Sequence, residues 1–196
     1  MPVPGGTSTL YADLAQLKAY LSIKDESRDV LLTQTLMAAA RYIDQVAGRR
    51  FYPDPVPTTR VYRTRGRVIE DRSGDGNLLL VDDIADDQDL AVALGSPALW
   101  TTYTGWLAEP ADPGQPITAL RGWWSGDTVR VTATFGWPAP PDEVVQATLI
   151  QASRLWKRKD SPEGVAGSAE WGAIRLSRRD PDVQALIDPY TLPGFA

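Results

Sequence analysis

The segment that most limits the fold is Phe51–Pro57, which reads Phe-Tyr-Pro-Asp-Pro-Val-Pro. Proline lacks a backbone N–H and disfavours helical backbone in the residue before it, so three prolines at alternate positions exclude a helix here. Before this segment, apolar residues recur at three- and four-residue spacing, and after it apolar and polar residues tend to alternate. The chain is therefore expected to change at this point from helices to strands.

Residues 9–50 are expected to form two helices. Thr9 or Asp13 is the predicted N-cap of the first helix, and Asp25 or Ser27 that of the second, which is predicted to end at Gly48. The apolar stripe of the first helix is predicted to comprise Tyr11, Leu14, Leu17 and Leu21. That of the second is predicted to comprise Leu32, Leu36, Ala39 or Ala40, Ile43, and Val46 or Ala47.

Residues 51–138 are expected to form an antiparallel β domain inserted between helices. Turn signals such as Ser73-Gly74-Asp75-Gly76 and Ser125-Gly126-Asp127 separate short β-rich segments. The expected strands are 59–64, 67–71, 78–81, 90–94, 99–103, 117–124 and 128–135.

The chain after residue 138 is expected to return to helix. Pro140-Pro141-Asp142-Glu143 is a start signal for a helix over 141–159, because proline and acidic residues favour the first turn. A glycine-rich loop and a short extended piece over 173–177 follow, and then a short helix over 181–187 with Asp180 as its N-cap.

These patterns predict an α+β fold. Two N-terminal helices and a third after the insertion form a small helical bundle, which carries the inserted antiparallel β domain and an extended C-terminal tail with a short helix. The expected divisions are 1–50, 51–138, 139–179 and 180–196.

Composition excludes several kinds of chemistry. The 196 residues contain no His and no Cys, which excludes Ser-His-Asp and Cys-His catalysis, disulfides and the usual zinc sites. A net charge of −5 argues against a duplex-DNA-binding protein. The N-terminus lacks the basic and apolar regions of a signal peptide, and no apolar run approaches a membrane span, so synthesis in the cytoplasm and no membrane partner are expected.

Several stretches could carry a binding site or chemistry, and each is weighed against a purely structural role. Residues 71–77 have oxygen-bearing side chains but not the spacing of a calcium loop, so solvated turns are favoured over a cation site. No carboxylate pair stands out for glycoside hydrolysis. Residues 154–159 are basic, which suits either nucleic acid or a helix C-terminus. Four tryptophans suit a sugar platform, a core or an outward protein-binding surface: Trp100, Trp106, Trp123 and Trp124.

Four stretches in a fixed order carry a resemblance to a known family. They are Leu14–Ile23 with Asp25–Phe51, Val129–Pro138 with Pro141–Val144, Arg154–Gly167, and Asp180–Tyr190. The first ends Ala-Gly-Arg-Arg-Phe, and the second reads Val-Arg-Val-Thr-Ala-Thr-Phe-Gly-Trp-Pro before Pro-Asp-Glu-Val. Together they resemble the head–tail connector (adaptor, or head-completion) family of tailed bacteriophages and gene-transfer particles; residues 54–125 match only in general character.

The resemblance implies a structural role in the virion neck without catalysis or cofactor. Family members form a ring, commonly of twelve copies, below the portal protein, extend the DNA channel and present a surface to the next neck or tail-completion protein. The helical part is expected to build the ring. DNA is expected to pass without specific binding, since each copy brings a net charge of −5.

Two sets of residues are candidates for these contacts. The C-terminal portal-docking set is Arg175, Arg178, Arg179, Leu186, Ile187, Tyr190, Leu192 and Phe195. Residues 41–67 carry seven arginines against two aspartates, and residues 70–89 carry eight acids against one arginine. From these stretches the candidates for charge complementarity between subunits are Arg49, Arg50, Arg60, Arg63, Arg65, Asp82, Asp83, Asp86 and Asp87.

The alternative interpretation is a carbohydrate- or protein-binding β module with helical flanks. An enzyme and a DNA-binding protein rank below it, because the chain lacks imidazole and thiol groups and is acidic.

Overall fold

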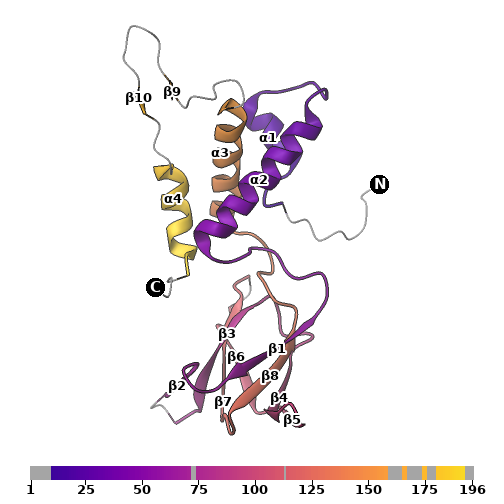
Figure 1. The fold of residues 1–196 in the computed structure, drawn as a ribbon, viewed down its shortest axis with the longest axis vertical. Helices are drawn as coiled ribbons and strands as arrows, with labels where there is room; N and C mark the ends of the chain where they lie inside the picture. Colours follow the sequence, from indigo (N-terminus) through magenta and orange to yellow (C-terminus); the bar gives the residue numbers. More distant parts are fainter. Residues whose placement is uncertain are drawn as a thin grey trace. The chain divides into compact units, whose positions relative to one another are not determined.

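The computed structural model describes residues 10–71, 74–112, 114–158, 165–166, 174–175 and 180–192. Within them lie helices and two four-stranded antiparallel sheets, which confirms the expected α+β fold (Figure 1). The chain divides into two compact units. The helical unit holds residues 10–49 and the described residues from Pro140 onward, and the β unit holds the described residues of 50–139.

The first helix, α1 (Leu14–Leu21), begins as the sequence predicts. The Asp13 side chain accepts the Gln16 N–H at 2.7 Å, and the Gln16 side chain accepts the Asp13 N–H at 2.8 Å. This reciprocal capping box satisfies two backbone donors that the first turn leaves open. Thr9, the alternative cap, lies outside the described residues.

The predicted N-cap of α2 (Asp29–Ala47) is wrong. Arg28 occupies the cap position and makes no side-chain capping bond. Asp25 instead accepts hydrogen bonds from the backbone and hydroxyl of Ser27, which closes a turn ahead of the helix. The predicted end is confirmed, because Gly48 adopts φ +68° and donates its N–H to the Asp44 carbonyl.

The core of the helical unit forms where α1 and α2 pack on α3 (Asp142–Arg158). Ala39 and Ala152 are fully buried, and such small side chains allow close approach of helix backbones. The short helix α4 (Pro181–Ile187) packs on α3, and Asp180 caps it as predicted by accepting the Asp182 N–H at 2.9 Å. A 3₁₀ turn, η1 (Asp188–Tyr190), follows. None of the described helices is long and apolar enough to cross a membrane.

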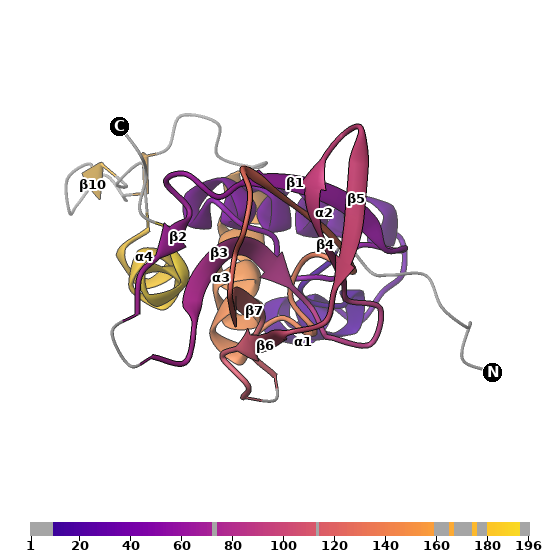
Figure 2. The same cartoon turned by 90° about the horizontal axis from the view of Figure 1, so that it is seen from below.

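The β unit is a sandwich of two antiparallel sheets. The first sheet has the order β1 (Thr58–Arg63), β8 (Thr128–Ala133), β4 (Ala91–Ser96) and β5 (Leu99–Tyr103). The second has the order β2 (Val68–Ile69), β3 (Asn77–Ile84), β7 (Ile117–Gly122) and β6 (Trp106–Glu109). The β4–β5 hairpin forms an edge of the first sheet and is seen from below in Figure 2.

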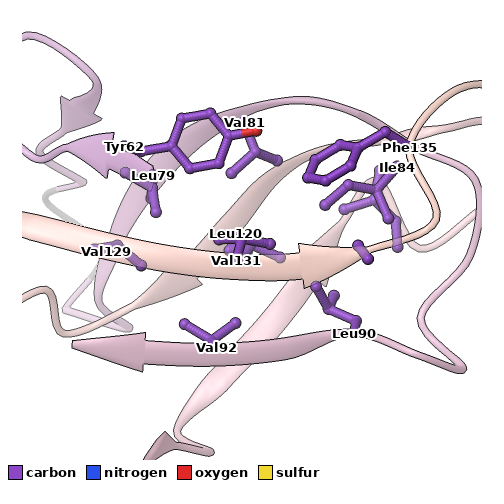
Figure 3. Close-up of a cluster of buried hydrophobic side chains, with 12 residues drawn as sticks. Tyr62, Leu79, Val81, Ile84, Leu90, Val92, Leu120, Val129, Val131 and Phe135 are labelled. Atoms are coloured by element: carbon purple, nitrogen blue, oxygen red, sulfur yellow. The ribbon is translucent and has the colours of Figure 1, made fainter. Parts of the chain in front are cut away.

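The β core lies between the two sheets. Val129 and Val131 of β8 point inward and are fully buried, as the alternation of that strand predicts. Figure 3 shows them facing Leu79 and Leu120 of the second sheet. Phe135 and Ile84 close one end of this cluster.

Most strand boundaries differ from the prediction by one or two residues, and β6, β3 and β2 differ most. Strand β6 was not expected, because its alternation lasts only four residues before Pro110. Strand β3 is longer than predicted, since an irregular register between Leu80 and Ile84 carries it past Val81. Strand β2 is only two residues long. Strand β10 (Ile174–Arg175) lies in the predicted extended piece and pairs with β9 (Val165–Ala166).

Candidate interaction surfaces

The C-terminal docking set divides by burial. Ile187 is 0% exposed, so it packs within the helical unit and presents no surface for docking. Leu186 is half-buried and Leu192 is 43% exposed. Arg175 contributes backbone to β10, and its side chain is outside the described residues, as are Arg178, Arg179 and Phe195.

Two hydrogen bonds hold the end of the described chain on the helical unit. The Tyr190 hydroxyl donates to Glu143 Oε2 at 2.8 Å, and the Leu192 N–H donates to the Ala47 carbonyl at 2.9 Å. The pKa of Glu143 lies below its ordinary value, mainly because its own backbone N–H at the helix start favours the carboxylate, and secondly because of Tyr190. Tyr190 and Leu192 are therefore placed at the surface with a defined backbone path.

Several of the predicted inter-subunit charges are engaged inside the β unit. Arg60 Nη1 lies 2.7 Å from Asp82 Oδ2, and Arg50 Nη2 lies 2.8 Å from Asp54 Oδ1. Tyr62 also donates to Asp82 at 3.1 Å. Burial, followed by the charge of Asp82, raises the pKa of Tyr62 to about 12, so the phenol stays neutral.

The other predicted charges differ among themselves. Asp83 accepts the Trp137 indole N–H at 3.0 Å, and Arg49 is half-buried in the helical unit. Those left exposed, with no ion pair to another described residue, are Arg63, Arg65, Asp86 and Asp87. These four have charge available for a partner.

The four tryptophans differ in their contacts and exposure. Trp124 donates its indole N–H to the Asn77 carbonyl at 2.8 Å, and Trp106 packs against the β core. Trp100 lies on the first sheet under the Arg130 guanidinium, whose carbon is 5.0 Å from the ring centroid. Trp123 is 64% exposed. Trp106 and Trp124 thus contribute to the core of the β unit, and Trp123 is the exposed tryptophan among the four.

Two acidic side chains on the second sheet, Asp71 and Glu109, share one arginine. Arg121 pairs with both Glu109 and Asp71, and these hydrogen bonds, the one to Glu109 first, raise its pKa. Asp71 is the first residue of the segment considered for calcium. Within the part of the chain that the structure describes, no group of three or more acidic residues is placed to hold a metal ion.

A surface that the sequence reasoning missed lies on the outside of the second sheet. Ile69 is 49% exposed, Leu80 39% and Leu107 67%. The available signal was Leu78-Leu79-Leu80-Val81, because four successive apolar residues indicate a strand covered on both faces, not one with a wet face.

Comparison with solved structures finds similar chains. The chain is similar to a chain of a solved structure described as "Neck of native GTA particle computed with C12 symmetry", at 20% sequence identity and a TM-score of 0.49. The alignment covers 100% of this chain and 98% of that chain. No family model matches the sequence. No curated protein matches it either.

Proposed function

We propose that this chain is a structural protein of the neck of a tailed phage or gene-transfer particle, a head–tail connector that forms a ring below the portal. The observation that carries the proposal is the order of the four stretches that resemble this family. They coincide with the α1–α2 pair, the β8–α3 junction, the end of α3 and the capped α4. The β unit fills the position between the second helix and β8 where the family match is only general.

The portal contact is assigned to the C-terminal segment. Tyr190 and Leu192 are held at the surface of the helical unit, and Leu186 is half-buried beside them in sequence. We retain the remaining predicted docking residues, Arg175, Arg178, Arg179 and Phe195, as part of the proposal. Ile187 is left out, because a fully buried side chain supports the helix and presents no surface.

The other neck partners follow from the same role. The β unit would meet the next neck or tail-completion protein, and Trp123 is an exposed aromatic residue suited to such a contact. DNA would pass through the ring without specific binding, since a net charge of −5 per copy gives phosphates little attraction.

Removal of residues 188–196 is expected to abolish binding to the portal while the monomer stays folded. The helix core ends at Ile187, so the deletion leaves the buried residues of α4 in place. Negative-stain images of portal mixed with the full chain should show an added ring of density, and the truncated chain should add none. As a control, Ala185→Ser changes an exposed position of α4 that is outside the proposed docking set, and it should still bind. A full chain that leaves the portal unchanged would refute the proposal.

A further inference from the structure

The outer side of the second sheet is an apolar surface that we name the leucine face, formed by Ile69, Leu78, Leu80, Leu107 and Ala119. Register places Ile69 beside Leu78, Leu80 beside Ala119, and Leu107 across from Arg121, so these residues lie on adjacent strands. Their inward neighbours Leu79 and Leu120 are fully buried in the sandwich core. The large exposed apolar side chains Ile69, Leu80 and Leu107 lie on three strands, β2, β3 and β6, whereas Ala119 of β7 is only 6% exposed. A group of large exposed apolar side chains marks an interaction site better than single ones do.

The leucine face carries an excess of negative charge. Arg121 lies in its middle and is paired with two carboxylates, Asp71 and Glu109. Both carboxylates are about one-third exposed. Glu70 and Asp75, near the strand ends, are exposed as well. A partner for this surface should therefore offer aliphatic contacts with cationic groups among them.

The outer side of the first sheet has this complementary character, and we name it the cationic face: Thr59, Val61, Arg63, Ala93, Trp100, Thr102, Thr128, Arg130 and Thr132. Its strands place Val61 beside Arg130 and Arg130 beside Ala93. No carboxylate stands at any of these described positions. Val61 is 53% exposed, although valine belongs to the residues usually buried.

The two arginines of the cationic face are available for pairing. Arg63 is exposed, and neither it nor Arg130 has an ion pair to a described residue. Arg130 lies over the Trp100 ring, and a guanidinium stacked in this way keeps its N–H edge open for a carboxylate. An arginine held in place loses less rotamer freedom when it binds.

The two faces are on opposite sides of one sandwich. The first sheet directs Tyr62 of β1 and Val129 and Val131 of β8 into the shared core. Side chains alternate along a strand, so the residues next to these three point outward from the core. The same alternation puts Leu78 and Leu80 on the outside of the second sheet. A molecule with complementary surfaces on opposite sides can associate head to tail, and such contacts generate rings when the rotation closes.

We propose that the leucine face of one copy docks on the cationic face of the next copy. This inference rests on the proposed ring and places part of its contact in the β units, in addition to the helical part that the family resemblance favours. Contact between the leucine faces of two copies would place Asp71 and Glu109 of one copy near the same carboxylates of the other. Contact between two cationic faces would place arginines near arginines. Charge therefore selects the head-to-tail pairing over either symmetric one.

The absence of cysteine makes a direct test possible, because any disulfide must come from introduced residues. Val61→Cys and Leu107→Cys place one thiol on each face, at side chains exposed enough for substitution without loss of core packing. The two variants are mixed and oxidised, and each is also oxidised alone. The mixture is expected to form mixed disulfide dimers several-fold faster than either variant forms its own dimer. Equal rates, or faster dimerisation of one variant alone, would overturn the proposal.

A charge variant tests the role of the cationic face independently. Arg63→Glu with Arg130→Glu, built into the Val61→Cys copy, should lower the rate of mixed dimers about tenfold, from the loss of two surface ion pairs. Gln88→Glu, at an exposed position of the β unit that lies on neither face, is the control and should leave the rate unchanged. An unaffected rate in the double variant would contradict the role of the cationic face.

These measurements use this chain alone, so their failure is distinguishable from failure of the neck assignment. A chain whose copies cross-link through the leucine and cationic faces but add no ring to the portal would overturn the proposed function. The proposed contact between the two faces would remain supported. A chain that adds a ring to the portal but shows no preference for mixed dimers would overturn the two faces and leave the function standing.

Discussion

Gly136→Ala is expected to destabilise the β unit by at least about 4 kcal/mol, an effect of exceptional size for a single methyl group. Gly136 adopts φ +118°, which is unfavourable for any residue with a β-carbon. A β-carbon there would overlap the Tyr52 carbonyl oxygen and lie 3.1 Å from Pro53 Cα. Backbone atoms cannot move aside by changing a rotamer, so the strand exit itself must shift.

Two backbone hydrogen bonds oppose such a shift of the strand exit. The Gly136 N–H donates to the Asp83 carbonyl at 2.7 Å, and the Asp54 N–H donates to the Phe135 carbonyl at 2.7 Å. Urea unfolding of the full chain, followed by tryptophan fluorescence, measures the loss. Gly126→Ala is the control, since Gly126 has φ +90° but nothing within 4 Å of the added carbon, and it should lose only about 1 kcal/mol. Similar losses in the two variants would show that the Tyr52 contact is unimportant.

Leu36→Ala is expected to lower the unfolding free energy of the helical unit by about 2–5 kcal/mol. Leu36 lies on α2, is fully buried and packs in the core that α1, α2 and α3 share, so the truncation leaves a cavity. The next residue, Met37, is 45% exposed, and Met37→Ala should change stability by no more than about 0.5 kcal/mol. Helix content followed by circular dichroism during denaturation checks both. Equal losses at the two positions would contradict the assigned buried face.

Local patterns were enough to predict most elements of the fold. The three- and four-residue spacing of Leu32, Leu36 and Ile43 marks the buried face of α2, and alternation marks β8. The cap of α2 was missed because Asp25 and Ser27 have the right side chains, and only their mutual hydrogen bonds divert them into a turn. Strand β6 is too short for its alternation to stand out.

The surfaces could be predicted less well, because they depend on contacts between distant segments. Arg60 and Asp82 are 22 residues apart, and only the arrangement of the sheets brings them to 2.7 Å, so a count of charges along the chain overstates what is available to partners. Ile187 belongs to the docking set predicted from the sequence, yet the packing of α4 buries its side chain. The leucine face needs the register of β2, β3, β7 and β6 before its residues can be seen together.

Deletion of the gene in a particle-producing host tests the proposed role in joining head to tail most directly. Electron micrographs of the deletion lysate are expected to show heads and tails that are not joined, and a plasmid copy of the gene should restore joined particles. Intact particles in the deletion lysate, at the number and appearance of the parent, would contradict the proposed role.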